Sequence, residues 1–202
     1  MSQRGTVDAS LHEGIGTNGF LAIGAVAGAI GWGGTELIHR RPALALDTLG
    51  MDALQAAVGL WVVLTLGMAA IGLTLASRAV RLSPPLWLWS ILVAAAIAID
   101  VAALEGLIAR EHLRYVLWQP WLLVFAIGYG VTGTVASGRN RRAYLAGSVA
   151  AAGAFILAIL FTARIEPHAF VLLGVLHAGP LLADAYASPT VTGHTGAEVM
   201  ES

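Results

Sequence analysis

Two ionisable residues lie within long apolar stretches of this sequence, and they are the first candidates for chemistry. Asp100 lies in AAAIAIDVAALEG and His177 lies in LLGVLHAGPLL. A charge near the centre of a bilayer costs ~2.5 kcal/mol or more, so ionisable residues there usually serve a function. If the two side chains lie at the same depth, they predict a carboxylate–imidazole pair that shares a proton. The alternative is structural, with Asp100 hydrogen-bonded to a neighbouring backbone and His177 packed in the core.

Two further acids extend this hypothesis of an intramembrane proton relay towards the helix ends. Asp184 lies one heptad beyond His177 and so falls near the same helix face, and Glu105 lies just beyond Asp100. Pro180 has no backbone N–H and can open the helix locally, which lets carbonyl groups line a cavity. We therefore expect the two acids to be the groups through which protons enter and leave the relay.

A second group of ionisable residues consists of three Glu/His pairs near predicted helix ends: Glu36 with His39, Glu111 with His112, and Glu166 with His168. In the favoured topology all three pairs lie on one face of the membrane. Three imidazoles are enough to bind zinc or copper, and two of them could ligate a haem near that surface. The alternative is that these are solvated side chains of the membrane interface, where such residues collect.

The composition indicates what kind of scaffold must position these residues. Of 202 residues, 57% are hydrophobic and 11% are charged, and the mean hydropathy is +0.78. Soluble domains are about a quarter charged, so this chain is predicted to be an integral membrane protein. The absence of cysteine excludes Cys-ligated metals, and the absence of lysine excludes a retinal Schiff base. A net charge of −1 offers no basic face to nucleic acid.

The apolar runs predict an all-α bundle of six transmembrane helices joined by short loops. Each run is apolar on every side and about 20 residues long, which is the length that crosses a bilayer. The predicted spans cover residues 19–38, 53–76, 85–109, 115–137, 143–163 and 168–187. Outside this domain of residues 19–187 we expect a polar N-terminal segment over 1–18 and a disordered polar tail over 188–202.

The placement of arginine favours a topology in the cell membrane with both termini in the cytoplasm. The two loops on that side contain no acid and carry Arg78, Arg81, Arg139, Arg141 and Arg142. Basic residues gather on the cytoplasmic side of membrane proteins. The orientation therefore depends mainly on the dense loop from Arg139 to Arg142.

Small and aromatic residues indicate how the helices pack. Gly24 and Gly28 have the small-xxx-small spacing, and more glycines follow in the fourth and fifth spans. These faces predict helix contacts within the bundle or, alternatively, contacts in a homo-oligomer or with partner membrane subunits. Residues near span ends predict an aromatic belt at the lipid headgroups: Trp87, Trp89, Tyr115, Trp118 and Trp121.

One short motif resembles a known family. The segment RYVLW, from Arg114 to Trp118, resembles the RYxxW start of the third helix in microbial rhodopsins, and VLH at His177 lies loosely where that family has VLD. Leu117 stands at the family's counter-ion position and Leu181 at its lysine position, and the predicted spans are six where the family has seven helices. The resemblance covers two short stretches, and retinal photochemistry remains excluded.

Two functional hypotheses follow from the sequence. The first is a small transporter or channel-like protein with a protonatable Asp/His pair inside the bundle. The second is an accessory or structural subunit of a larger membrane complex, such as a respiratory one. A membrane enzyme that binds a metal or haem at the Glu/His pairs is a more distant third. No phosphate-binding loop, nucleophile elbow or HExxH motif occurs, so no catalytic residues are predicted.

Overall fold

The structure, a computed structural model, describes residues 14–136 and 138–186. These residues form helices, together with one isolated β-bridge between Ile15 and Ala76. The elements are α1 (Thr17–Arg40), α2 (Pro42–Leu49), α3 (Ala53–Thr74), α4 (Arg78–Arg81), α5 (Pro84–Leu104), α6 (Arg110–Val116), α7 (Gln119–Val135), α8 (Gly138–Leu160), α9 (Thr162–Ile165), η2 (Glu166–His168) and α10 (Ala169–Tyr186). The predicted tail over 188–202 and most of the predicted segment over 1–18 lie outside the described residues.

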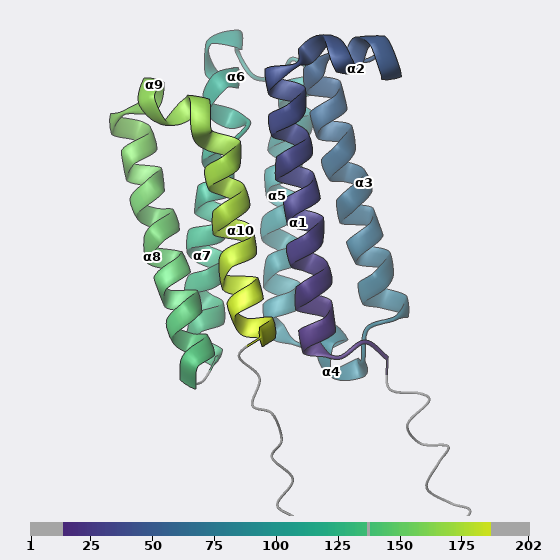
Figure 1. Cartoon of the computed structure of the whole chain (residues 1–202), viewed down its shortest axis with the longest axis vertical. Helices are drawn as coiled ribbons and strands as arrows, with labels where there is room; N and C mark the ends of the chain where they lie inside the picture. Colours follow the sequence, from purple (N-terminus) through teal and green to yellow (C-terminus); the bar gives the residue numbers. More distant parts are fainter. Residues whose placement is uncertain (1–13, 137, 187–202) are drawn as a thin grey trace, which may run out of the picture.

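The helices pack side by side as a bundle that suits a bilayer (Figure 1). Within the described residues, five helical segments are long and apolar enough to cross a membrane: Thr17–Arg40, Ala53–Thr74, Pro84–Leu104, Asn140–Leu160 and Thr162–Tyr186. α7 runs beside them but has only 17 residues. The all-α membrane bundle is therefore confirmed, whereas a sixth crossing by α7 stays a prediction.

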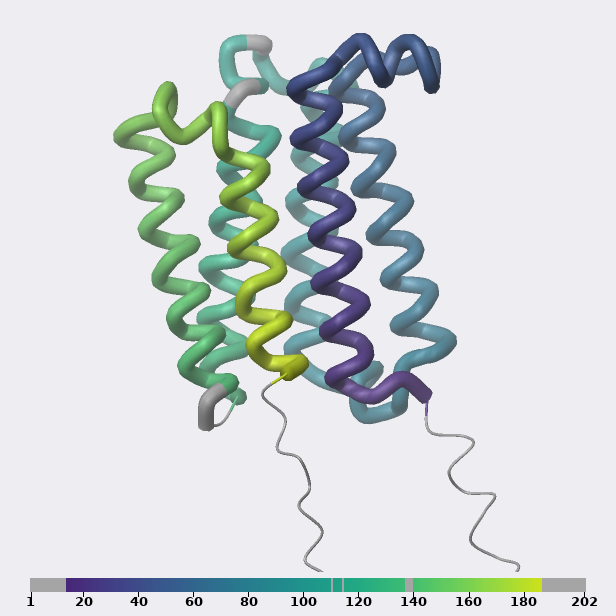
Figure 2. The backbone as a smooth tube through the Cα atoms, viewed as in Figure 1, coloured from purple at the N-terminus to yellow at the C-terminus, as the bar shows by residue number. Residues whose placement is uncertain are grey.

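The chain alternates up and down, as the tube in Figure 2 shows. α1 lies between α10 and α3, with α5 and α7 behind them and α8 next to α7 and α10 (Figure 1). We call the end that carries α2, α6 and α9 the α2 end, and the opposite one the α4 end. Both ends of the described chain lie at the α4 end, which agrees with two termini on one side of the membrane.

Helix boundaries follow from capping residues at the helix ends. Asp52 caps α3 in a capping box, since its carboxylate accepts from the Gln55 N–H at 2.8 Å and its own N–H donates to the Gln55 side chain at 3.1 Å. The predicted span 85–109 is too long, because α5 ends at Leu104. Gly106 adopts φ +71° there, and its N–H and that of Leu107 bond back to the last turn, so the helix terminates as a glycine cap.

The connections at the α2 end contain short helices where short loops were expected. α2 starts at Pro42, is capped by Gly50 with φ +66°, and lies across the end of the bundle (Figure 1). Its exposed apolar side chains include Leu46 and Leu49. A helix that presents leucines at the end of a membrane bundle suits the interfacial layer of lipid.

Most of the predicted aromatic belt is wrong, because these rings form the core. Trp118 and Trp121 are each 2% exposed, and the indole of Trp89 donates to Thr132 Oγ1 at 3.1 Å. Trp87, at 57% exposed, is the tryptophan that fits the prediction. The interior of the bundle therefore contains large aromatic rings, whereas a sequence rich in alanine, glycine and leucine suggests close contacts between helix backbones.

Glycines make room for these rings. A Cβ on Gly31 would lie 2.6 Å from the Trp61 ring, and one on Gly128 would lie 2.6 Å from the Trp89 ring. By contrast, Gly33 and Gly59 have no neighbour within 4 Å. The space beside the inward glycines is thus filled by side chains of the same chain. Contacts with partner subunits through the outward-facing glycines stay a prediction.

Candidate functional site

A cavity of about 230 Å³ lies in the bundle towards the α2 end. Its wall includes the last turn of α1 and the first turn of α3, and it extends inwards to α5, α7 and α10. The wall is mostly apolar and aromatic, and its residues include Trp32, Thr35, Trp61, Asp100, Trp121 and Phe170. A concave, mostly apolar pocket with few polar groups is the usual form of a small-molecule site.

Asp100 is the acidic group in the wall of this cavity. It lies one turn before the end of α5 and is 5% exposed. Its Oδ2 accepts a hydrogen bond from Trp121 Nε1 at 3.2 Å, whereas its buried Oδ1 has no hydrogen-bond partner within the described part of the chain. A buried acceptor without a partner costs ~1–3 kcal/mol. The carboxyl group is therefore positioned to accept a hydrogen bond or a positive charge from a ligand.

Three tryptophans pack together beside the carboxyl group. The ring centroids of Trp32 and Trp61 are 4.5 Å apart, those of Trp61 and Trp121 are 5.2 Å apart, and those of Trp32 and Trp121 are 5.3 Å apart. Phe170 from α10 stacks 6.3 Å from Trp32. The cavity wall thus presents aromatic rings from α1, α3, α7 and α10.

Hydrogen bonds hold these rings in position. Trp61 Nε1 donates to Thr35 Oγ1 at 3.1 Å, and that hydroxyl donates to the Gly31 carbonyl at 2.8 Å. Trp32 Nε1 donates to His177 Nδ1 at 3.4 Å. Each indole N–H of the three tryptophans has an acceptor, so the orientation of every ring is set by a polar contact. Side chains fixed in this way form a preorganised wall.

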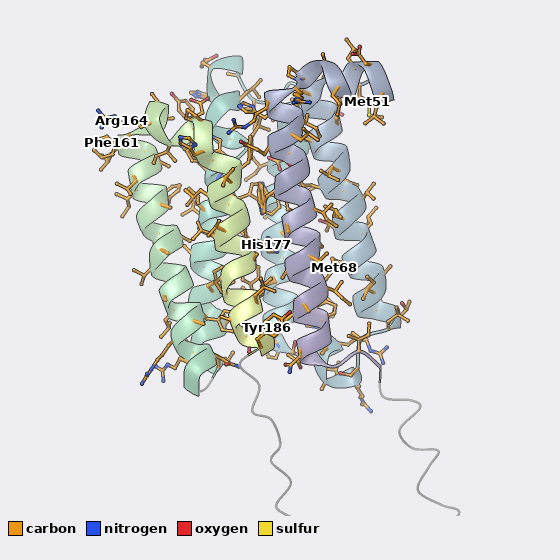
Figure 3. All side chains as sticks on the ribbon, viewed as in Figure 1. Met51, Met68, Phe161, Arg164, His177 and Tyr186 are labelled. Atoms are coloured by element: carbon orange, nitrogen blue, oxygen red, sulfur yellow. The ribbon has the colours of Figure 1, made fainter. Side chains whose placement is uncertain are left out.

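His177 is not among the residues that line the cavity, but it contacts one of them, Trp32. It sits midway along the bundle where α10 faces α1 (Figure 3). Its ring occupies the space over Gly28, where a Cβ would lie 2.3 Å from Cδ2. It also packs edge-on against Phe125, with centroids 5.3 Å apart. In its contacts, this half-buried side chain behaves as a packing histidine between helices.

The structure does not bring Asp100 and His177 together. Asp100 bonds to Trp121, while His177 bonds to Trp32, and these two indole rings pack against each other with centroids 5.3 Å apart. Direct sharing of a proton is not available in this arrangement. The predicted pair is replaced by two separate polar contacts to one tryptophan cluster.

The two acids predicted to admit and release protons have different surroundings. Asp184, near the α4 end of α10, accepts hydrogen bonds from Asn140 Nδ2 and Tyr144 Oη of α8. We call this group the Asp184 latch. Glu105 is the exposed residue that caps α5 at the other end. Neither acid lines the cavity.

The Glu/His pairs lie at the α2 end, as the topology predicted, but they do not form a cluster. Glu36 pairs with Arg40 at 2.5 Å, and His39 packs against Phe170 with centroids 5.4 Å apart. Glu111 and His112 lie on α6, and Glu166 and His168 lie on η2. Across residues 14–136 and 138–186, no three His, Asp or Glu side chains are placed to hold a metal ion.

Sequence reasoning missed the residues that build the cavity wall. Trp32, Thr35 and Trp61 were not singled out, although both tryptophans lie well inside predicted spans. A tryptophan of an interfacial belt lies at a span end, so a mid-span tryptophan signals a core or a site. Gly31, one residue before Trp32, was the second signal, because it accommodates the Trp61 ring.

Comparisons with protein families, curated proteins and solved structures found no match for this chain.

Proposed function

We propose that this chain is a small membrane transport protein whose substrate site is the cavity against Asp100. One observation carries the proposal: Asp100 lies in the wall of a cavity inside a membrane bundle, and its buried Oδ1 has no hydrogen-bond partner among the described residues. Ionisable residues at membrane depth are rare and usually mark substrate or ion pathways. A purely structural carboxyl group would be expected to have both oxygens satisfied.

The two ends of the bundle differ in a way that suits transport. The cavity wall includes helix ends at the α2 end, whereas the Asp184 latch ties α10 to α8 at the α4 end. A substrate site reached from one side, with the other side held shut, is one of the two states that alternating access requires. Opening the latch would be the step that gives the second state.

α10 connects the cavity to the latch and contains the element that can bend. Phe170 lies in the cavity wall at one end of this helix and Asp184 lies at the other. Between them, Pro180 cannot donate a backbone hydrogen bond, and Tyr129 Oη donates to the nearby His177 carbonyl at 2.8 Å. Pro180 removes the N–H that would bond to the Leu176 carbonyl, and a proline of this kind provides a hinge within a membrane helix.

We further propose that the α4 end faces the cytoplasm and that the protein resides in the cell membrane. The arginines of the loops at that end support this orientation.

Single-cysteine labelling tests the proposed function, because the chain has no native cysteine. Ala57→Cys places a thiol in the cavity wall. In sided membrane vesicles, an impermeant maleimide should label it from the α2 end. Adding Asp184→Asn, which weakens the latch, should allow labelling from the α4 end as well.

Gly59→Cys is the matched control, since it lies on the same helix at similar depth but on the exposed face. Lipid should protect it from both sides in both backgrounds. If Ala57→Cys is labelled from one side alone whether or not the latch is intact, the proposed alternating access, and with it transport, is contradicted. Stoichiometric partner chains in mild detergent would favour the accessory-subunit hypothesis instead.

A further inference from the structure

We infer that the cavity binds a small organic cation, namely an ammonium group with apolar substituents. This inference rests on the proposed function in so far as the cavity is the substrate site. Three features of the cavity support a cation of this kind: the charge of the site, the chemistry of the wall and the size of the space. Each of these narrows the class of ligand independently.

The charge of the site favours a cation. Asp100 brings a carboxyl group whose Oδ1 lacks a partner among the described residues. Apart from His39, no basic residue is found among the described residues of the cavity wall. An anion would meet repulsion from the carboxylate, and a neutral apolar ligand would leave Oδ1 buried and unpaired. A cation supplies the missing opposite charge.

The wall favours an organic cation over a metal ion. A metal ion would need several oxygen or nitrogen ligands at short range, and the described residues place no three His, Asp or Glu side chains for one. The wall instead contains the rings of Trp32, Trp61, Trp121 and Phe170. Aromatic rings, and tryptophan above all, attract quaternary ammonium groups through the negative charge of their faces.

The size of the cavity limits the ligand further. Its volume of about 230 Å³ lies below the ~300–1,000 Å³ typical of drug-sized pockets. Trp61 and Trp121 are also fixed by hydrogen bonds to Thr35 and Asp100, so the wall is held in shape. A compact ammonium compound, rather than a long-chain amine, matches this space.

Binding of choline to the purified full chain in detergent tests the inference. Choline carries a trimethylammonium group, and dimethylbutanol is its uncharged carbon isostere. Tryptophan fluorescence reports binding, since three tryptophans line the cavity. We expect choline to bind saturably and about tenfold or more tightly than the isostere, which corresponds to one charge-dependent interaction.

Asp100→Asn should lower choline affinity about tenfold or more, and Asp100→Glu should retain part of it. Asp47→Asn is the matched control, because it removes an exposed carboxylate at the same end of the bundle. If Asp100→Asn fails to fold, the preference of the unmodified chain for choline over its isostere still decides. Equal affinity for both probes, or no binding of choline, would overturn the inference.

The two proposals fail in different ways. Choline binding without two-sided labelling of Ala57→Cys keeps the cation site and removes transport. Two-sided labelling without a preference for choline keeps transport and removes the cation.

Discussion

Replacing Gly28 by alanine probes how tightly α1 and α10 pack around the His177 ring. The new Cβ would lie 2.3 Å from His177 Cδ2, 2.5 Å from Nε2 and 2.6 Å from Cγ. These distances are too short for carbon contacts, so the ring or the helix must move. The ring has little room, because it is held by Trp32 at 3.4 Å and packs against Phe125.

The expected cost of Gly28→Ala can be worked out from these contacts. Overpacking of a well-packed interior costs ~1–3 kcal/mol, while alanine in place of glycine favours a helix by ~1 kcal/mol. We therefore expect a net loss of up to about 2 kcal/mol in the free energy of unfolding. Gly33→Ala is the matched control on the same helix, since nothing lies within 4 Å of its Cβ position. It should gain up to ~1 kcal/mol.

Unfolding in mild detergent micelles, followed by tryptophan fluorescence, measures both variants. The double variant Gly28→Ala with His177→Ala identifies the cause, because removing the ring should recover most of the loss relative to His177→Ala alone. If Gly28→Ala proves as stable as Gly33→Ala, the close packing of His177 over Gly28 is refuted. An unchanged cost in the His177→Ala background would refute the assigned contact.

Three other predictions concern stability in the same assay. Asp100→Asn should unfold at no lower temperature than the unmodified chain, because an uncharged amide is cheaper to bury and its oxygen still accepts from the indole; a clear loss would show that the charge is structurally required. Tyr129→Phe should lower the free energy of unfolding by about 0.6 kcal/mol, the average for a hydrogen bond between membrane helices, because the bond from Tyr129 Oη to the His177 carbonyl is lost; an unchanged stability would show that this bond does not hold α7 to α10. Tyr144→Phe should lower the free energy of unfolding by a similar amount, and this loss should be smaller in the Asp184→Asn background, because the hydrogen bond between the two residues is already weakened. Equal losses in both backgrounds would show that the two side chains do not interact.

Much of the fold was predictable because membrane insertion constrains sequence locally. A run of about 20 apolar residues is by itself a spanning helix, since every backbone group is satisfied within it. The predicted span 53–76 accordingly became α3, Ala53–Thr74, and 168–187 became α10, Ala169–Tyr186. Helix ends were less predictable, because a single residue such as Gly106 ends α5 before the apolar run is over.

The candidate site was only half predictable. Asp100 could be singled out because a charged residue in an apolar run is costly wherever the helix lies. Its partner could not, because a histidine in an apolar run is as compatible with packing as with proton transfer. In the structure, His177 accepts a hydrogen bond from Trp32 and Asp100 accepts one from Trp121. Both contacts join residues far apart in the chain.

The sequence by itself therefore determined the class of protein, the approximate spans and one buried carboxyl group, because each depends on local hydropathy and charge. Only the tertiary structure decided which face of each helix turns inward. That choice carried Trp32, Trp61 and Trp121 into the core and placed Asp100 in the wall of a cavity, with no partner for its buried Oδ1 among the described residues. The physical reason is that helices apolar on every side have no pattern to mark their inner face, so ring packing and hydrogen bonds across helices select it.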